Sequence, residues 1–320
     1  MTLNFIKEVA AISFTLFYAA NAITVEDFVR MRCSTDPNVE VVMTWDGAVY
    51  AVPEQQSQQK LFQLTGMNIA RCLKDEDGMY WFTSRELMYY LDPETREPLS
   101  SWTNPWTKQT YPVMHVANNP VESPFGMPDD EWDSSTANGG FVSFLSDTNL
   151  FYDNPLYGNE SYVDYAPYEH YEGGEYFKYF TPQAGLDQPT DSVTNETFFS
   201  WSRTSQWLPW MGMYASTDDK ADTPPDGYML YSCTGGAVAS IDDLPAFMVE
   251  DINNRLPLYQ HAPPCVLDIP DETSWTYFGK HFDAFLAGDK FPVEAPTQDF
   301  PCQFEPAGIT ATQKSVNPRH

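Results

Sequence analysis

The sequence predicts a mainly β protein, an antiparallel barrel or curled sandwich with two C-terminal helices and long loops. Aromatic residues make up 15% of the chain and proline occurs 26 times, which suits strands joined by many turns. Strand patterns also follow one another at short intervals, without the alternation of strands and helices that a parallel sheet requires. We expect the long loops at residues 118–140 and 181–196, where no strand pattern is evident.

The N-terminus carries an apolar run from Val9 to Ala20, preceded by Lys7. The run is shorter than the ~20 apolar residues that cross a bilayer as a helix. It ends with alanine at positions 20 and 22, the two small residues that a signal peptidase reads. We therefore expect residues 1–22 to be a cleaved signal peptide; a buried helix is the alternative.

The remainder of the chain is interpreted as one β-rich domain, residues 23–300, followed by a flexible tail, residues 301–320. Its size is sufficient for a single large core. Two glycosylation sequons begin at Asn159 and Asn195, which predicts a glycoprotein of the secretory pathway or the extracellular space.

Five cysteines follow the expected signal peptide, at positions 33, 72, 233, 265 and 302. Oxidation is permitted in a secreted protein, and the odd number leaves one thiol unpaired. We expect Cys265 to pair with Cys302. No pair has the CxxC spacing of a zinc site.

Two hairpins are predicted near the start of the domain. Residues 39–52 alternate around Asp46-Gly47, and residues 66–91 alternate around Asp77-Gly78; Asp-Gly is a strong hairpin signal. Further strands are predicted at residues 110–117, 141–144, 176–180, 198–201 and 228–233.

Two helices are predicted towards the C-terminus. Ser240 and Asp243 have the spacing of a capping box at the start of residues 240–255. Residues 271–286 carry apolar side chains at steps of three and four, a stripe that packs against a core; they are Trp275, Phe278, Phe282 and Phe285.

The formal net charge of -28 argues against nucleic acid and against an anionic membrane surface as partners. The sequence has no GxSxG, HExxH, P-loop or GxGxxG motif. We therefore expect no metal and no cofactor, and an apolar or aromatic small molecule as the partner. The sequence gives no indication of the oligomeric state.

The first candidate segment is residues 99–121. Trp102 and Trp106 can hold a planar ligand, the amides of Asn104 and Asn118 can donate hydrogen bonds, and His115 can carry a proton near neutral pH. The alternative is that the Asn-Pro steps are turns and that the histidine is a core residue.

The second candidate is the hairpin that carries Arg71, Glu86 and Tyr90. Its register puts the arginine and the glutamate on neighbouring strands. An inward ion pair indicates a site, because desolvation makes it a poor stabiliser. An outward cross-strand pair is the alternative.

A third candidate is residues 201–214, where Trp210 and Met211 can form an adaptable apolar lining. Core packing is the alternative explanation.

Several of these segments resemble a known family. They include Gly66-Met67-Asn68-Ile69-Ala70-Arg71, Ser84-Arg85-Glu86, Trp102-Thr103-Asn104-Pro105-Trp106-Thr107 and the run from His115 to Val121. The resemblance is to the large bacterial and fungal family catalogued as domain of unknown function eighteen thirty-eight. It covers most of the chain after the signal peptide and is strongest over residues 40–121. One departure stands at Asn118-Asn119-Pro120, where the family pattern has Asn-Asp-Pro.

The chain also resembles the secreted fungal hetero-Diels–Alderases of tropolonic sesquiterpenoid pathways. This second resemblance implies a secondary-metabolite pericyclase, of the isomerase or lyase type, that joins an o-quinone methide to a macrocyclic terpene such as a humulene, with prior dehydration if the precursor is an alcohol. It implies Arg71, Asn104 or Asn118 as the carbonyl donor, and His115 or Glu86 as the proton shuttle. A non-catalytic carrier and a hydrolase built on Glu86 and His115 are the alternatives.

Overall fold

The computed structural model describes residues 22–137, 140–214, 224–268, 273–291 and 301–303. The signal peptide predicted for residues 1–22 lies outside the described residues except for its last residue. The predicted tail lies outside them except for residues 301–303. None of the described helices is long and apolar enough to cross a membrane.

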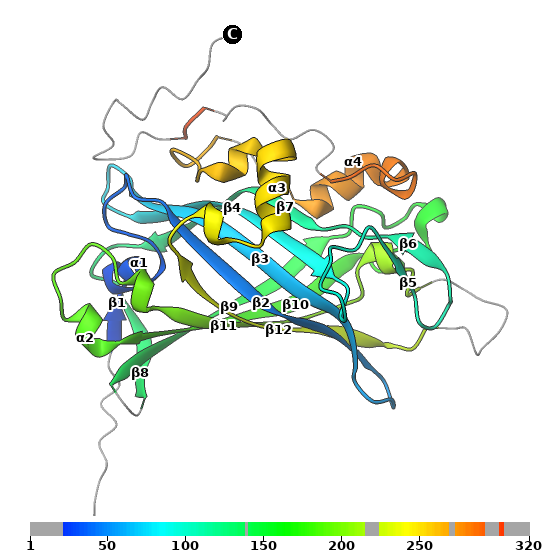
Figure 1. The fold of residues 1–320 in the computed structure, drawn as a ribbon, viewed down its shortest axis with the longest axis horizontal. Helices are drawn as coiled ribbons and strands as arrows, with labels where there is room; N and C mark the ends of the chain where they lie inside the picture. Colours follow the sequence, from blue (N-terminus) through cyan, green and yellow to red (C-terminus); the bar gives the residue numbers. More distant parts are fainter. Residues whose placement is uncertain (1–21, 138–139, 215–223, 269–272, 292–300, 304–320) are drawn as a thin grey trace, which may run out of the picture.

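Ten strands form one antiparallel sheet in the order β1-β8-β9-β10-β11-β12-β2-β3-β4-β7 (Figure 1). The sheet curls into a half-barrel, which confirms the predicted fold class. The strands are β1 (Ala22–Thr24), β2 (Val41–Pro53), β3 (Gln59–Lys74), β4 (Tyr80–Leu91), β7 (Val116–Gly126), β8 (Glu131–Ala137), β9 (Phe141–Asp153), β10 (His170–Pro182), β11 (Phe198–Ser205) and β12 (Gly227–Val238). A separate ribbon pairs β5 (Ser101–Thr103) with β6 (Thr110–Pro112).

Four α-helices lie at the ends and on the outer side of this sheet (Figure 1). They are α1 (Val25–Arg32), α2 (Gln183–Leu186), α3 (Ala246–Arg255) and α4 (Ser274–Leu286). Short 3-10 helices are η1 (Glu160–Tyr162), η2 (Thr194–Glu196), η3 (Pro209–Met211), η5 (Ile241–Asp243) and η6 (Pro257–Gln260).

Local capping signals set the starts of three helices. Thr24 caps α1 in a capping box with Asp27, and Thr273 caps α4. The capping box predicted at Ser240 and Asp243 is confirmed, but it begins a 3-10 turn. The chain becomes α-helical only after Pro245, whose missing N–H suits the start of a helix.

The hairpin predicted over residues 66–91 is confirmed. Strands β3 and β4 pair from Gln63↔Leu91 to Lys74↔Tyr80. Asp75 closes the turn, because its carboxylate accepts the backbone N–H groups of Asp77 (3.0 Å) and Met79 (2.9 Å).

The hairpin predicted over residues 39–52 is wrong, because residues 41–52 lie in the single strand β2. Gly47 is a point of close approach rather than a turn. A Cβ there would lie 2.1 Å from the carbonyl oxygen of Ser232 and 2.6 Å from Sγ of Cys233, on the neighbouring strand β12. The sequence signal was misread because glycine serves both purposes.

The loop predicted at residues 118–140 is also wrong. Most of this segment forms β7 and β8. Glycine, proline and acidic residues are frequent in it, and these residues masked the strand pattern. The loop predicted at residues 181–196 joins β10 to β11 and contains α2 and η2.

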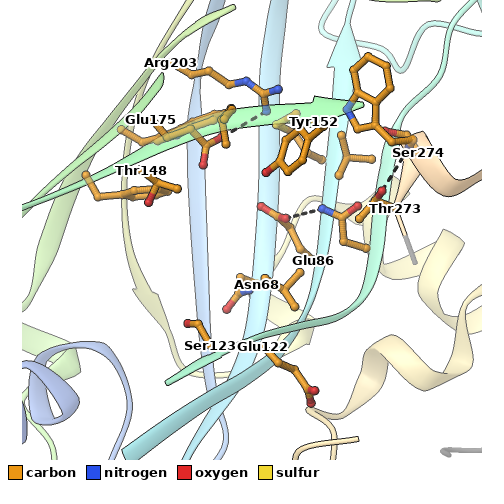
Figure 2. Close-up of a pocket in the computed structure, with 18 of the residues that line it drawn as sticks. Asn68, Glu86, Glu122, Ser123, Thr148, Tyr152, Glu175, Arg203, Thr273 and Ser274 are labelled. Carbon is orange, nitrogen blue, oxygen red and sulfur yellow. Dashed lines mark hydrogen bonds and ion pairs between the residues drawn. The ribbon is translucent and has the colours of Figure 1, made fainter. Parts of the chain in front are cut away.

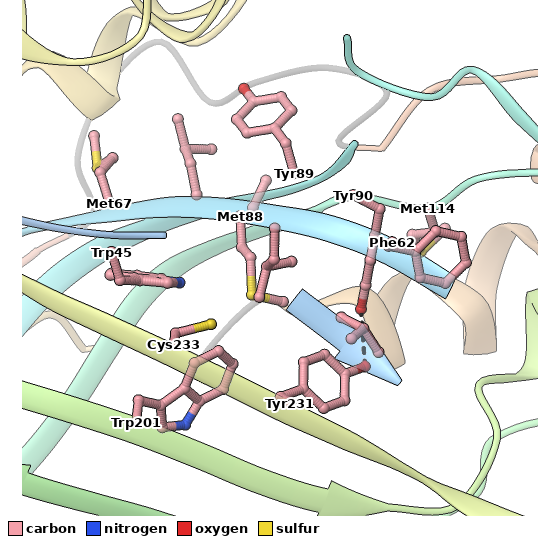
Figure 3. Packing of buried hydrophobic residues seen from close by; sticks show 14 of the residues in the cluster. Trp45, Phe62, Met67, Met88, Tyr89, Tyr90, Met114, Trp201, Tyr231 and Cys233 are labelled. Carbon is pink, nitrogen blue, oxygen red and sulfur yellow. Dashed lines mark hydrogen bonds between the residues drawn. The ribbon is translucent and has the colours of Figure 1, made fainter. Parts of the chain in front are cut away.

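Side chains alternate between the two faces of the curled sheet (Figure 3). Met88 and Tyr90 point to the inner side, together with Trp201 of β11, whereas Tyr89 points to the outer side. The outer side is covered by α3, where Tyr89 packs edge-on against Phe247 at 5.3 Å. The protein therefore has apolar packing on both faces, and the inner face surrounds a cavity.

Two disulfides fix the ends of the domain. Cys33 and Cys72 join the end of α1 to β3, and the predicted pair Cys265 and Cys302 is confirmed. The remaining thiol, Cys233, is buried and unpaired, and burial raises its pKa to about 12. Two disulfides fit an extracellular or secretory protein.

The close approach at Gly47 gives the first prediction. Gly47→Ala should lower the free energy of unfolding by about 3 kcal/mol or more, because the new methyl group meets backbone atoms that cannot move aside. Chemical denaturation measures this. Gly158→Ala is the control: its φ of 80° is strained for alanine, but no atom lies within 4 Å, so the cost should be about 1 kcal/mol. Equal losses would contradict the assignment.

Candidate functional site

The inner side of the half-barrel surrounds a cavity of about 1240 Å³. Phe28 and Arg32 of α1 line it, and Trp275 and Phe278 of α4 line it from the other terminal region of the chain. Phe28 packs tightly there, at 5.1 Å from both Trp132 and Phe144. Aromatic and methionine side chains form a large part of the remaining wall, and polar and charged side chains form a comparable part.

Glu86 is the central polar group of this wall (Figure 2). It points inward from β4, and its Oε2 accepts a hydrogen bond from Nδ2 of Asn118 on β7 at 2.8 Å. Burial raises the pKa of the Glu86 carboxyl to about 7, and the negative charge of Glu175 contributes to the rise. At neutral pH the carboxyl can therefore both donate and accept a proton.

Glu175 and Arg203 form an ion pair on strands β10 and β11, where they are direct register partners. The Arg203 Nη1 to Glu175 Oε1 distance is 3.2 Å, and Nη2 donates to the hydroxyl of Tyr171 at 2.6 Å. The curl of the sheet brings this pair to the same cavity as Glu86 (Figure 2). Glu175, the carboxylate that faces Glu86 across the cavity, is thus paired with Arg203.

Arg32 enters the cavity from the C-terminal end of α1. Its Nη2 donates to Oδ1 of Asn68, whose Nδ2 donates to Ser84 at 2.8 Å. The guanidinium lies 4.7 Å above the ring of Phe82. Both Arg32 and Asn68 are buried, so α1 delivers a positive charge to the interior through a fixed chain of hydrogen bonds.

Tyr90 and Trp210 belong to the aromatic wall, as the sequence predicted. The Tyr90 hydroxyl lies 3.1 Å from the hydroxyl of Tyr231 (Figure 3), and its ring packs against Trp210 at 5.5 Å. Burial raises the pKa of Tyr90 to about 12, which keeps its phenol neutral.

Neither the inward ion pair of Arg71 and Glu86 nor the alternative outward cross-strand pair forms. The register places Arg71 opposite Thr83 and Glu86 opposite Asn68, so the two side chains point to opposite faces of the hairpin. Arg71 instead donates to Oε1 of Glu40 at 2.6 Å, outside the cavity lining. Glu86 lies opposite Asn68, and Arg71 is three residues further along β3. Because this offset is odd, Arg71 points to the other face of the sheet.

His115 also lies away from the cavity, because the neighbouring lining residues of this segment are Met114 and Val116. Its Nδ1 accepts the backbone N–H of Tyr90 at 3.2 Å, and its ring packs against Tyr89 at 5.0 Å. Burial lowers the pKa of His115 to about 4, so the ring is neutral at physiological pH. The His115 and Glu86 pair considered for a hydrolase is not formed.

Asn104, Trp102, Trp106 and Met211 are packing and turn residues in this structure, and none lines the cavity. Asn104 closes its turn by accepting the backbone N–H of Trp106 at 2.8 Å and donates to the carbonyl of Met211 at 3.1 Å. Trp102 packs edge-on against Trp210 at 6.2 Å, and Trp106 packs against Trp207. Of the five predicted catalytic residues, Glu86 and Asn118 are the two that meet in the cavity.

The family departure at Asn119 also lies outside the cavity lining. Its Oδ1 accepts a hydrogen bond from Nε of Arg85 at 2.8 Å. An aspartate at this position would form an ion pair with the same arginine. The departure therefore changes a buried structural contact and leaves the cavity unaltered.

Sequence reasoning missed Arg32, Asn68, Glu175 and Arg203. A signal was present for Glu175, because it occupies the same period-2 face as Phe177 and Tyr179, which also line the cavity. No sequence pattern indicated that Arg32 faces the cavity, because its hydrogen-bond partner Asn68 lies 36 residues away in the sequence. Asn159 and Asn195 of the two sequons are exposed. Within the described residues, no group of three His, Cys, Asp or Glu side chains is placed to hold a metal ion.

Fold and site together define a class: a curled antiparallel sheet whose inner face encloses an aromatic-lined cavity with buried ionisable groups. A family model described as "Protein of unknown function (DUF1838)" matches residues 38–282. The chain belongs to this family, which confirms the first resemblance drawn from the sequence. No curated protein and no solved structure was found to match the chain.

The like charge of Glu175 gives a prediction for Glu86. Glu175→Gln should lower the pKa of the Glu86 carboxyl, because it removes a negative charge and leaves the positive charge of Arg203 unpaired. Carbon-13 NMR of the glutamate side chains measures this titration. Glu172→Gln is the control, since Glu172 is exposed on the opposite face of the same strand and should leave the pKa unchanged. A rise in pKa would contradict the geometry.

The raised pKa of Glu86 also predicts how stability depends on pH. The folded state binds the Glu86 proton more tightly than the unfolded state does, so stability falls as pH rises from about 4.5 to about 7. Glu86→Gln removes this loss. Relative to the wild type, the variant should gain up to about 3 kcal/mol between pH 4.5 and pH 8. Urea unfolding across this range measures it, and a difference independent of pH would refute the assignment.

Proposed function

We propose that this protein is an enzyme that acts on an apolar or aromatic small molecule, with Glu86 as the general acid and base. The observation that carries the proposal is a carboxyl group with a pKa of about 7 inside an aromatic-lined cavity. Such a pKa lets one group protonate a leaving group and accept a proton at neutral pH. Asn118 orients the carboxyl through its 2.8 Å hydrogen bond.

Perturbed carboxyl groups in enclosed cavities are typical of functional sites. A buried glutamate near a second carboxylate costs stability. Here the cost falls on Glu86, which forms no ion pair with any residue that the structure describes. Glu175, by contrast, is paired with Arg203 at 3.2 Å. This division of roles, one carboxylate paired and one free to titrate, supports assignment of Glu86 as the proton-transfer group.

For the reaction, we propose a hetero-Diels–Alder cycloaddition between an o-quinone methide and a macrocyclic terpene. The cavity of about 1240 Å³ exceeds the usual ~300–1,000 Å³ of pockets for one small ligand, so two reactants can be held together. Holding them in one orientation can lower the barrier by ~7–11 kcal/mol. This narrower assignment rests on the size of the cavity and on the resemblance noted above.

The same site supports the preceding dehydration. Protonated Glu86 donates to the hydroxyl of a benzylic alcohol, the C–O bond breaks, and water leaves. The ring hydroxyl of the substrate loses its proton, which returns the carboxyl to its starting state through the released water. The balance is loss of one water molecule, with no oxidant or reductant. The quinone methide then forms one C–C and one C–O bond to the alkene of the terpene.

We also propose that the protein acts outside the cytosol as a glycoprotein. The two disulfides, the exposed asparagines of both sequons and the predicted signal peptide support this. The net charge of -28 supports a partner other than nucleic acid or an anionic membrane.

Substitution of the proton-transfer group tests the proposal. Glu86→Gln should lower the rate of dehydration and cycloaddition by about 10²–10⁴-fold, the usual contribution of general acid–base catalysis. The assay mixes purified protein with a benzylic alcohol precursor and humulene, and compares product yield and stereochemical ratio with a protein-free reaction. Binding of the precursor, measured by calorimetry, should persist in the variant.

His115→Gln is the matched control, because His115 lies outside the cavity and is neutral at the assay pH. It should retain activity after correction for folded protein. Wild-type yield and stereochemistry identical to the protein-free reaction would refute the cycloaddition. Binding without turnover of any substrate would instead assign the protein as a carrier.

A further inference from the structure

Two tryptophan side chains in the cavity wall present N–H groups without a protein acceptor. Trp45 and Trp201 line the cavity and are 7% and 6% exposed. In the described part of the chain, neither indole Nε1 has a hydrogen-bond partner. Buried donors are nearly always paired in native proteins, so an unpaired donor that borders a cavity indicates the position of a ligand atom.

The two donors belong to one region of the wall. Trp45 lies on β2 and Trp201 on β11, with ring centroids 6.2 Å apart. Figure 3 shows both rings on the inner side of the sheet, near Cys233. Gly66 makes this arrangement possible, because a Cβ at that position would lie 2.4 Å from the ring of Trp45. The absence of a side chain at Gly66 therefore leaves room for the indole of Trp45.

Two arginines, Arg203 and Arg32, add further hydrogen-bond donors to the cavity. Arg203, two residues after Trp201 on the same face, has a buried Nε without an acceptor. Arg32 hydrogen-bonds the neutral amide of Asn68, and no ion pair of Arg32 with a carboxylate occurs within the described residues. Acceptor atoms lie on the opposite wall. They are the Glu86 carboxyl and Oδ1 of Asn118, and the latter has no hydrogen-bond partner among the described residues. The cavity thus has a donor wall on β2 and β11 and an acceptor wall on β4 and β7.

We propose that the ligand is a planar ring system bearing a carbonyl or deprotonated hydroxyl oxygen, and that the indole N–H groups of Trp45 and Trp201 bind its oxygen atoms. The inference rests on the proposed function and names the substrate class of that site. At the indole N–H groups a ligand cation is disfavoured, because hydrogen-bond donors and the nearby Arg203 guanidinium repel a positive charge. The ring lies against the aromatic wall, and the ligand hydroxyl that exchanges a proton faces Glu86.

Binding of a matched set of naphthalene derivatives to the full-length protein tests this inference. The set is naphthalene, 2-acetonaphthone, 2-naphthoate and 2-naphthylmethylammonium, measured by isothermal titration calorimetry. The ketone and the carboxylate should bind at least tenfold more tightly than the ammonium compound. Trp45→Phe and Trp201→Phe keep a ring and remove the N–H. Each should weaken ketone binding by about three- to tenfold, the value of one hydrogen bond, and leave naphthalene binding within twofold.

Trp106→Phe is the control, since this ring packs outside the cavity against Trp207 and should change no affinity. Equal binding of all four compounds, tighter binding of the ammonium compound, or unchanged ketone binding in both variants would overturn the inference. If that happens while Glu86→Gln still abolishes turnover, the proposed function stands and the substrate class falls. If the ketone binds selectively through the indoles but neither the wild type nor any variant shows turnover, the ligand class stands and the proposed enzyme function falls.

Discussion

The curl of the sheet is the constraint on which the site depends. Glu86 on β4 and Glu175 on β10 are separated by β3, β2, β12 and β11 in the hydrogen-bonded order, so a flat sheet would keep them far apart. The curl turns both inner faces towards one space. Two carboxyl groups then share a poorly solvated interior, and their repulsion adds to the effect of burial in raising the pKa of Glu86. Without the curl, both causes of the raised pKa of Glu86, burial and the charge of Glu175, would be absent.

Neutralisation of one carboxylate makes this arrangement stable enough to fold. Arg203 contacts Glu175 and Tyr171, and its guanidinium lies 5.5 Å from the ring of Tyr231. Arg32 is held by Asn68 and Phe82. Arg32 and Arg203 thus bring two cations to the cavity, and Glu175 is paired with one of them, whereas the charge of Glu86 can change near neutral pH. Glu122, Asp153 and Lys280 also line the cavity. A cavity with this balance can accept a proton or an electron-rich ligand oxygen without a large change in its electrostatic energy.

The aromatic wall and the polar groups have different structural origins. Glycines at positions 47 and 66 remove side chains where neighbouring strands and rings come close, and this gives Trp45 its seat. The capping box of α1 fixes the angle at which Phe28 and Arg32 enter the interior. The shape of this cavity therefore depends on backbone features as well as on the side chains that line it.

The sequence by itself determined the local features: the strand-rich class, the turn at Asp77-Gly78, the capping box at Ser240 and the Cys265–Cys302 pair. The turn and the capping box depend on neighbours a few residues away, and such signals survive in a linear pattern, whereas the two cysteines are 37 residues apart. Only the tertiary structure decided that Gly47 lies within a strand, that Arg71 and His115 face away from the cavity, and that Arg32, Glu175 and Arg203 face into it. The face of Arg71 follows from the register of the β3–β4 hairpin. The other outcomes depend on pairings between distant strands, and in both cases a shift of one residue reverses the face of every side chain.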